Sequence, residues 1–292
     1  MASSAADLEQ QYSPSAWVQR VAPSEVVRLF AEAVTAAAQR ARASLPCELD
    51  IRYGDGPEQR YSVLGTNVPD DAPLAVFIHG GYWQEMDLAS SDGVALGFHR
   101  LGWRTVTVGY DLAPAVTLDE IVAQVRTVGR RILQMALDLR SRAVLLFGHS
   151  AGAQLVAMLL ADWSTLGDSE RPPIVAAVHI SGVFDLEPLL HTSVNEKVGM
   201  DGACAQRNSP MRHVGAVTRI SRARHLVLVG EHDSPEFRRQ AREYASALKD
   251  AKCDATCHIL PTRDHFDMCE ALADADSDVM KLVKENLKDL IN

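Results

Sequence analysis

Short apolar runs separated by turn residues recur through most of the chain. Continuous apolar runs of this length predict strands that are covered on both faces of a sheet. Two further segments, ELDIRYG (48–54) and QRYSVLG (59–65), alternate apolar and polar residues around a turn at 54–57 and predict a strand pair. The continuous runs are PLAVFIHG (73–80), RTVTVGYD (104–111), RAVLLFG (142–148), IVAAVHISG (174–182), HLVLVGEHD (225–233) and ATCHILP (255–261).

Helical spacing of apolar residues fills the segments between these runs. It predicts helices over residues 24–43, 91–100, 151–163, 235–249 and 277–290, and a long helix that begins near Thr117, whose capping-box partner is Glu120. Strands that alternate with helices indicate a mostly parallel central sheet with helices on both faces. We expect one domain over residues 1–292, with a small cap formed by the irregular segment 187–216.

The composition and the net charge limit the kinds of partner that the protein is expected to bind. The formal net charge is −9 and the sequence pI is about 5.6, which disfavours nucleic acid because phosphate binding needs clustered Lys and Arg. The longest apolar region, residues 143–163, carries His149, Ser150 and Gln154, so no stretch suits a membrane. We leave open whether the protein forms a homodimer.

The five cysteines indicate a reducing compartment. Their number is odd, and only Cys253 and Cys257 are closely spaced, in KCDATCHIL, which reads as the approach to a strand rather than as a metal or redox site. The start of the chain, MASSAADLEQQ, lacks the basic and apolar parts of a signal peptide. We therefore expect a cytoplasmic protein with no metal and no cofactor.

The segment FGHSAGAQ offers a nucleophile. Ser150 lies between Gly148 and Gly152, after an apolar strand and before an apolar helix, which is the context of the G-x-S-x-G elbow. The glycines leave room for a tight turn that exposes the hydroxyl, and the helix directs its N-terminal amides at any negative charge formed there. The alternative is a serine that only caps the helix.

A serine hydroxyl needs a base, and chains with this elbow place the acid and then the histidine after later strands. HILPTRDHFDMCE offers His265, which we prefer to His258 because His258 lies within a strand pattern. VLVGEHDSPEF offers Asp233 as the acid, and Glu231 is the alternative carboxylate. In this arrangement His265 exchanges the proton of the nucleophile, and Asp233 orients the imidazole. His232 and His149 are interpreted as ordinary histidines.

The loop HGGYWQEMD follows the first buried strand. Attack on a carbonyl forms an oxyanion, which needs hydrogen-bond donors already in place. The amide of Ala151 supplies one donor, and Gly80 and Gly81 let backbone amides of this loop supply another. Tyr82 and Trp83 then form an aromatic wall beside a planar substrate, or else they pack beneath the loop. We expect His79 to hold the loop in place.

Taken together, these motifs resemble the serine-hydrolase form of kynurenine formamidase (arylformamidase), which is related to the hormone-sensitive-lipase-like esterases. The resemblance runs from about residue 12 to the last helix. The Tyr-Trp pair that follows two glycines is more specific to this family than the G-x-S-x-G element. The segments that carry it are HGGYWQEMD, GYDLAPAVTLDEI, GHSAGAQL, SGVFDLEPL, NSPM, GEHDSPEF and DHFDMCE.

The resemblance implies an α/β-hydrolase fold and hydrolysis of N-formyl-L-kynurenine to L-kynurenine and formate in tryptophan catabolism. The triad would be Ser150, Asp233 and His265, with no metal. Two other functions stay open at this point. One is a carboxylesterase that acts on small acyl esters, and the other is a binding protein of the same fold that has lost its chemistry.

Overall fold

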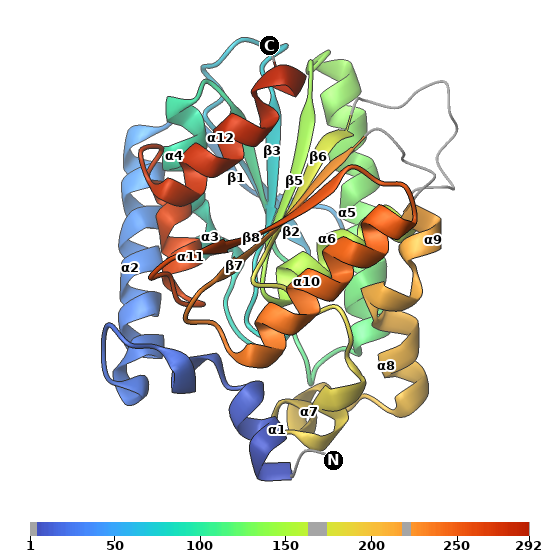
Figure 1. The fold of residues 1–292 in the computed structure, drawn as a ribbon. Coiled ribbons are helices and arrows are strands. Elements are labelled where there is room, and N and C mark those ends of the chain that lie inside the picture. The colour runs from blue at the N-terminus through green and yellow to red at the C-terminus, as the bar shows by residue number, and fades with distance from the viewer. Residues whose placement is uncertain (1–4, 163–173, 218–222, 292) are drawn as a thin grey trace.

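The computed structural model describes residues 5–162, 174–217 and 223–291. One eight-stranded sheet runs through these residues in the order β1-β2-β4-β3-β5-β6-β7-β8 (Figure 1). Strands β3 to β8 pair in parallel wherever they are neighbours, while β2 runs antiparallel to both β1 and β4. The strands are β1 (Cys47–Arg52), β2 (Arg60–Leu64), β3 (Leu74–Ile78), β4 (Arg104–Val108), β5 (Val144–His149), β6 (Ile174–Ile180), β7 (Arg224–Gly230) and β8 (Ala255–Leu260).

Helices cover both faces of the sheet, which confirms the predicted architecture. Figure 1 shows α2, α4, α11 and α12 on one side and α5, α6 and α10 on the other. The α-helices are α1 (Ala5–Gln11), α2 (Pro23–Ser44), α3 (Leu88–Ser91), α4 (Ala95–Arg100), α5 (Leu118–Asp138), α6 (Ala151–Asp162), α7 (Val194–Val198), α8 (Gly202–Asn208), α9 (Val214–Val217), α10 (Pro235–Asp250), α11 (Asp267–Glu270) and α12 (Asp278–Ile291). Short 3₁₀ helices are η1 (Pro14–Trp17), η2 (Asp92–Val94), η4 (Glu187–His191), η5 (Pro210–Arg212) and η7 (Ala271–Ala273).

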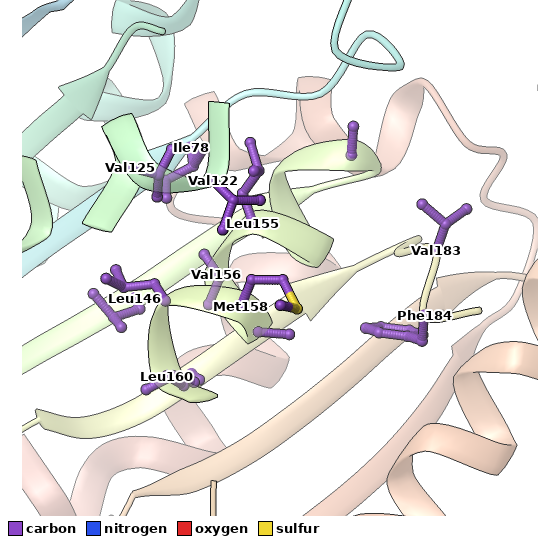
Figure 2. Packing of buried hydrophobic residues seen from close by; sticks show 14 of the residues in the cluster. Ile78, Val122, Val125, Leu146, Leu155, Val156, Met158, Leu160, Val183 and Phe184 are labelled. Atoms are coloured by element: carbon purple, nitrogen blue, oxygen red, sulfur yellow. The ribbon is translucent and has the colours of Figure 1, made fainter. Parts of the chain in front are cut away.

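Each face of the sheet carries a large hydrophobic core. Val76 and Ile78 of β3 belong to the core under α5, α6 and α10, while their neighbour Phe77 belongs to the core under α2, α4 and α12. This alternation is the two-residue period of a strand. It explains why the buried strands are continuous apolar runs in the sequence, because helices cover both faces of the sheet. Figure 2 shows the first core, where Val122 of α5 lies beside Leu155 of α6.

Most predicted elements are confirmed, and the capping box is among them. Thr117 Oγ1 accepts from the amide of Glu120 at 3.3 Å, and the Glu120 carboxylate accepts from the amide of Thr117 at 2.7 Å. The helix predicted over 91–100 is instead split into α3, η2 and α4. A Cβ at Gly93 would lie 2.7 Å from the Cβ of Ala37, so the close approach of α2 shapes the chain here. Trp163, where the helix after Ser150 was predicted to end, lies outside the described residues.

The segment predicted as a cap, 187–216, folds into five short helices, from η4 to α9. Helix α7 lies next to α1 at one end of the molecule (Figure 1), where Ser193 Oγ donates to Glu9 Oε1 at 2.6 Å. Among the described residues, no helix combines the length and the apolar character needed to cross a membrane.

Four of the buried histidines lie on a strand or directly after one. His179 of β6 and His225 of β7 stack with ring centroids 5.7 Å apart. His79 directly follows β3, and His149 is the last residue of β5. Burial lowers the pKa of His79 and His225 to about 4 and that of His149 and His179 to about 3. These rings are therefore neutral in the native state at pH values where the unfolded chain would protonate them.

We expect the free energy of unfolding to fall as the pH drops below about 6.5, the ordinary histidine pKa, because the unfolded state then binds the extra protons. Each histidine that stays neutral contributes up to about 1.4 kcal/mol per pH unit. Burial raises the pKa of Asp267 to about 6, so this carboxyl binds a proton in the native state below that pH. Its proton offsets part of the contribution of the four histidines. Urea unfolding at pH 7, 6 and 5 measures the slope, and a stability that is constant or rises toward pH 5 would contradict it. His225→Phe should reduce the slope, whereas the exposed His191→Gln should not.

Candidate active site

Ser150 occupies a strained turn between β5 and α6. Its φ is 55°, in the left-handed region that non-glycine residues rarely adopt, and its amide donates to the carbonyl of Ile180 at 2.8 Å. A Cβ on Gly152 would lie 2.1 Å from the carbonyl oxygen of Ile78, and one on Gly148 would lie 2.2 Å from that of Gly152. Close backbone packing therefore requires both glycines of the G-x-S-x-G element.

Asp233 follows β7 and is almost completely buried. Its Oδ1 accepts from Nδ1 of His265 at 2.7 Å, and its Oδ2 accepts from Ser181 Oγ at 2.6 Å and from the amide of Gly230 at 3.1 Å. Burial alone raises the pKa of this carboxyl, but the charge and hydrogen bond of His265 and the donors Ser181 and Gly230 together hold the pKa below its ordinary value. The group is therefore a carboxylate at neutral pH.

His265 lies in the loop after β8. Because an ionised carboxylate only accepts hydrogen bonds, Nδ1 carries the proton and the lone pair is on Nε2. The ring of Phe237 packs edge-on against the imidazole, with centroids 4.9 Å apart. The loop is fixed by Asp264, whose Oδ1 accepts from the amides of Phe266 and Asp267, both at 2.9 Å. Ser150 and His265 line the same cavity.

The glycine loop after β3 packs directly against the nucleophile. A Cβ on Gly80 would lie 2.8 Å from the Cβ of Ser150, so only glycine fits. Tyr110 Oη donates to the carbonyls of His79 and Gly80, at 2.9 and 3.3 Å. Since N–H and C=O of a trans peptide point in opposite directions, the amides of Gly80 and Gly81 point away from Tyr110. His79 stacks on Tyr110 with centroids 4.3 Å apart, and its Nδ1 lies 2.9 Å from the carbonyl of Gly80.

The two aromatic residues of this loop have different environments. Both have a positive φ, 48° at Tyr82 and 60° at Trp83. Tyr82 lines the cavity, and its hydroxyl donates to the carbonyl of Tyr12 at 2.7 Å. Trp83 is fully buried, and its Nε1 donates to Gln154 Oε1 of α6 at 3.0 Å. The geometry thus favours substrate contact for Tyr82 and packing beneath the loop for Trp83.

The alternative acid, Glu231, and the alternative base, His258, lie outside the site. Glu231 is exposed and accepts from the amide of Thr262 at 2.8 Å. No hydrogen bond joins Glu231 to His265 within the described ranges of the chain. His258 is on β8, where its Nε2 lies 3.1 Å from Thr256 Oγ1. The structure therefore brings His265 to Asp233 and to the cavity of Ser150, and leaves these alternatives outside.

The cavity has a volume of about 830 Å³, within the usual range for a small-molecule site. Helix α2 contributes an apolar wall that includes Phe30 and Val34. Val194 and Lys197 of α7 and the preceding Ser193 line the cavity as well. In the part of the chain that the structure describes, no group of three or more His, Cys, Asp or Glu residues could hold a metal ion. Cys257 is within β8 and Cys253 precedes it, and both thiols are free.

Several residues of the site were missed by sequence reasoning. Ser181 supports the acid, Tyr110 holds the glycine loop, and Gln154 and Tyr12 receive the hydrogen bonds of Trp83 and Tyr82. Ser181 directly follows β6, and Tyr110 lies shortly after the end of β4. The rule that ligands bind at the carboxyl ends of parallel strands could therefore have indicated both residues. Tyr12 carries no such signal because it precedes the sheet in the chain.

Comparisons with known proteins agree with this geometry. A family model described as an alpha/beta hydrolase fold matches residues 75–268. A kynurenine formamidase of Salmo salar is 36% identical over 281 residues, which are 95% of this chain and 94% of that protein. A kynurenine formamidase of Danio rerio is 36% identical over 280 residues, with the same coverage.

A solved structure gives the same fold. A protein from Silicibacter sp. TM1040 with a provisional thioesterase assignment superposes with a TM-score of 0.76, at 31% sequence identity. The match covers 95% of this chain and 99% of that one. An α/β-hydrolase fold, an elbow serine in the cavity of a carboxylate-bound histidine, and relatives matched over nearly their full length agree with one another. This chain belongs to the kynurenine formamidase family of α/β hydrolases.

Proposed function

We propose that this protein hydrolyses N-formyl-L-kynurenine to L-kynurenine and formate, with Ser150 as nucleophile, His265 as general base and acid, and Asp233 as the residue that orients and stabilises the imidazole. The hydrogen bond of 2.7 Å between His265 and the ionised Asp233, beside the cavity of Ser150, is the observation that carries the proposal. It supplies a base with a free Nε2 to a hydroxyl that is otherwise a weak nucleophile. The choice of N-formyl-L-kynurenine as substrate is based on the similarity to kynurenine formamidases.

The first half of the reaction transfers the formyl group to the enzyme. Ser150 Oγ attacks the formyl carbon while His265 Nε2 takes the hydroxyl proton, and the carbonyl oxygen becomes an oxyanion. When the tetrahedral intermediate collapses, the C–N bond breaks and His265 returns the proton to the arylamine nitrogen. L-Kynurenine leaves, and a formyl ester of Ser150 remains.

The second half consumes one water molecule. His265 removes a proton from the water as its oxygen attacks the formyl ester, and it then protonates Ser150 Oγ as formic acid leaves. The acid releases its remaining proton to solvent and becomes formate. Asp233 stays ionised throughout and stabilises the imidazolium that forms twice per turnover. Its lowered pKa is suited to that role, since a protonated Asp233 could not offset the positive charge.

Backbone amides donate hydrogen bonds to the oxyanion. Ala151 is the first residue of α6, so its N–H is one of the helical amides without an intrahelical acceptor, and the helix dipole adds positive potential there. Gly80 and Gly81 supply the other donors from the loop held by Tyr110. One such donor typically contributes about 2.7 to 4 kcal/mol to lowering the barrier.

The cavity suits an aryl substrate. Tyr82 offers an aromatic face beside the reacting carbonyl, and the apolar wall of α2 lies in the same cavity. Residues 194 and 197 of α7 and residue 193 before it also line the cavity, which supports the proposal that the segment 187–216 acts as a small cap. The five free cysteines support a cytoplasmic location.

Turnover of N-formyl-L-kynurenine by the purified protein, followed as release of L-kynurenine, tests this function. Replacing the nucleophile in Ser150→Ala should lower kcat at least about 10³-fold. Ser44→Ala is the matched control, because Ser44 is exposed and its hydroxyl donates to the carbonyl of Arg40 within the same helix. Turnover that survives in Ser150→Ala, or is absent from the unmodified protein, would end the proposal.

A second experiment separates the two aromatic residues. Tyr82→Ala should raise KM for N-formyl-L-kynurenine about tenfold, because an aromatic contact is lost, and should change turnover of a small alkyl ester little. Trp83→Ala should lower the free energy of unfolding by about 3 to 5 kcal/mol and reduce both activities alike. Kinetics on both substrates, together with urea unfolding, distinguish substrate contact from packing for each residue. A loss confined to the aryl substrate in Trp83→Ala would show that this buried ring contacts substrate.

A further inference from the structure

His149, which directly precedes the nucleophile, contacts the loop of the general base. It is the last residue of β5, its side chain is buried, and its Nε2 lies 2.8 Å from the main-chain carbonyl of His265. A carbonyl only accepts hydrogen bonds, so Nε2 carries the proton and donates. The residue adjacent to Ser150 in the chain is thus hydrogen-bonded to the backbone of the base, 116 residues later.

The other edge of the same ring faces the glycine loop. A Cβ on Gly80 would lie 3.2 Å from Nδ1 of His149, so this edge packs against the loop that holds the oxyanion donors. Burial, with a smaller contribution from the charge of His265, lowers the pKa of His149 to about 3. The ring is therefore neutral in the working pH range, with its one proton on Nε2.

Packing leaves the His149 ring little freedom. Phe30 of α2 lies against it at a centroid distance of 6.4 Å, and also against Phe266 at 5.4 Å. The rings of His149 and His265 are 4.8 Å apart. Asp264 fixes the amides that follow the base, at Phe266 and Asp267, whereas the carbonyl of His265 itself is held by His149.

We propose that His149 is a positioning residue, whose hydrogen bond to the carbonyl of His265 fixes the distance between the base and the nucleophile. The inference rests on the proposed function and adds a residue that acts through the backbone of His265. His149 also lines the cavity. The bond from Asp233 fixes only Nδ1 of the imidazole, so the ring still needs a fixed backbone to direct Nε2 at Ser150. A displacement of about 1 Å at a catalytic group can cost about 100-fold in rate.

Two amide variants of His149 isolate the hydrogen bond. His149→Gln places an amide nitrogen at the reach of Nε2, whereas the amide of His149→Asn lies at the position of Nδ1, too short to reach the carbonyl of His265. His149→Phe keeps a planar ring without any donor. His225→Phe is the matched control, because His225 is also buried and neutral but stands at the start of β7, at the opposite edge of the sheet.

The readouts are kcat and KM for N-formyl-L-kynurenine, the rate at which a fluorophosphonate labels Ser150, and the melting temperature. His149→Asn and His149→Phe should lower kcat and the labelling rate about 10- to 100-fold, with KM within about twofold of the unmodified value. His149→Gln should restore kcat to within about fivefold. His225→Phe should lower the melting temperature and leave kcat unchanged.

Either of two results would overturn the inference. If folded His149→Asn and His149→Phe keep kcat within about twofold, the ring serves packing alone. If His149→Gln is as impaired as His149→Asn at equal melting temperature, the hydrogen bond is not what matters. A failure of the proposed function is distinguishable from both, because the unmodified protein itself would then not turn over N-formyl-L-kynurenine. If Ser150 serves another acyl substrate, the fluorophosphonate labelling rate still reports the effect of the His149 variants.

Discussion

The hydrogen bond between the buried carboxylate of Asp233 and Nδ1 of His265 is the interaction on which the rest of the site depends. Removing a carboxylate from water is costly, and here Ser181, Gly230 and the imidazole supply the donors that offset the cost. The bond also decides the chemistry, because it places the proton of His265 on Nδ1 and leaves Nε2 as the atom that can accept one. A base of this kind is what converts an elbow serine into a nucleophile.

The parallel sheet makes that bond possible. Strands β7 and β8 are neighbours in parallel register, with Gly230 opposite Leu260, so the loops that follow them leave the same edge of the sheet. Strands β5 and β3 end at this edge as well, and they bring Ser150 and the glycine loop. Residues far apart in sequence thus meet because their strands end together, which is the general reason that α/β sheets bind ligands at this edge.

Backbone strain is concentrated at the same edge. Ser150, Ser181, Tyr82 and Trp83 all have φ between 47° and 60°, and each follows a strand at its carboxyl end. Conformations of this kind cost about 1 to 3 kcal/mol each and persist where the surrounding packing enforces them. Here the packing is backbone against backbone, as the contact between Gly152 and the carbonyl of Ile78 shows. The site is therefore held in place before any substrate enters.

The sequence predicted much of this arrangement because its signals are local. Continuous apolar runs mark strands covered on both faces, and Thr117 with Glu120 marks a helix start. Ser150 stands out through its glycines, strand and helix. Contacts that join distant segments leave no such mark: nothing near Trp83 reveals that it reaches Gln154, and nothing near Tyr12 reveals that it receives the Tyr82 hydroxyl.

The identity of the acid tests the account most directly. Two carboxylates, Glu231 and Asp233, follow β7, and the structure shows His265 hydrogen-bonded to Asp233. The decisive measurement is kcat for Asp233→Asn beside Glu231→Gln, with the melting temperatures of both variants. Asp233→Asn should lower kcat about 10⁴-fold, since the amide favours the wrong imidazole tautomer, while Glu231→Gln should stay close to the unmodified protein. A nearly silent Asp233→Asn together with an inactive, folded Glu231→Gln would contradict the account.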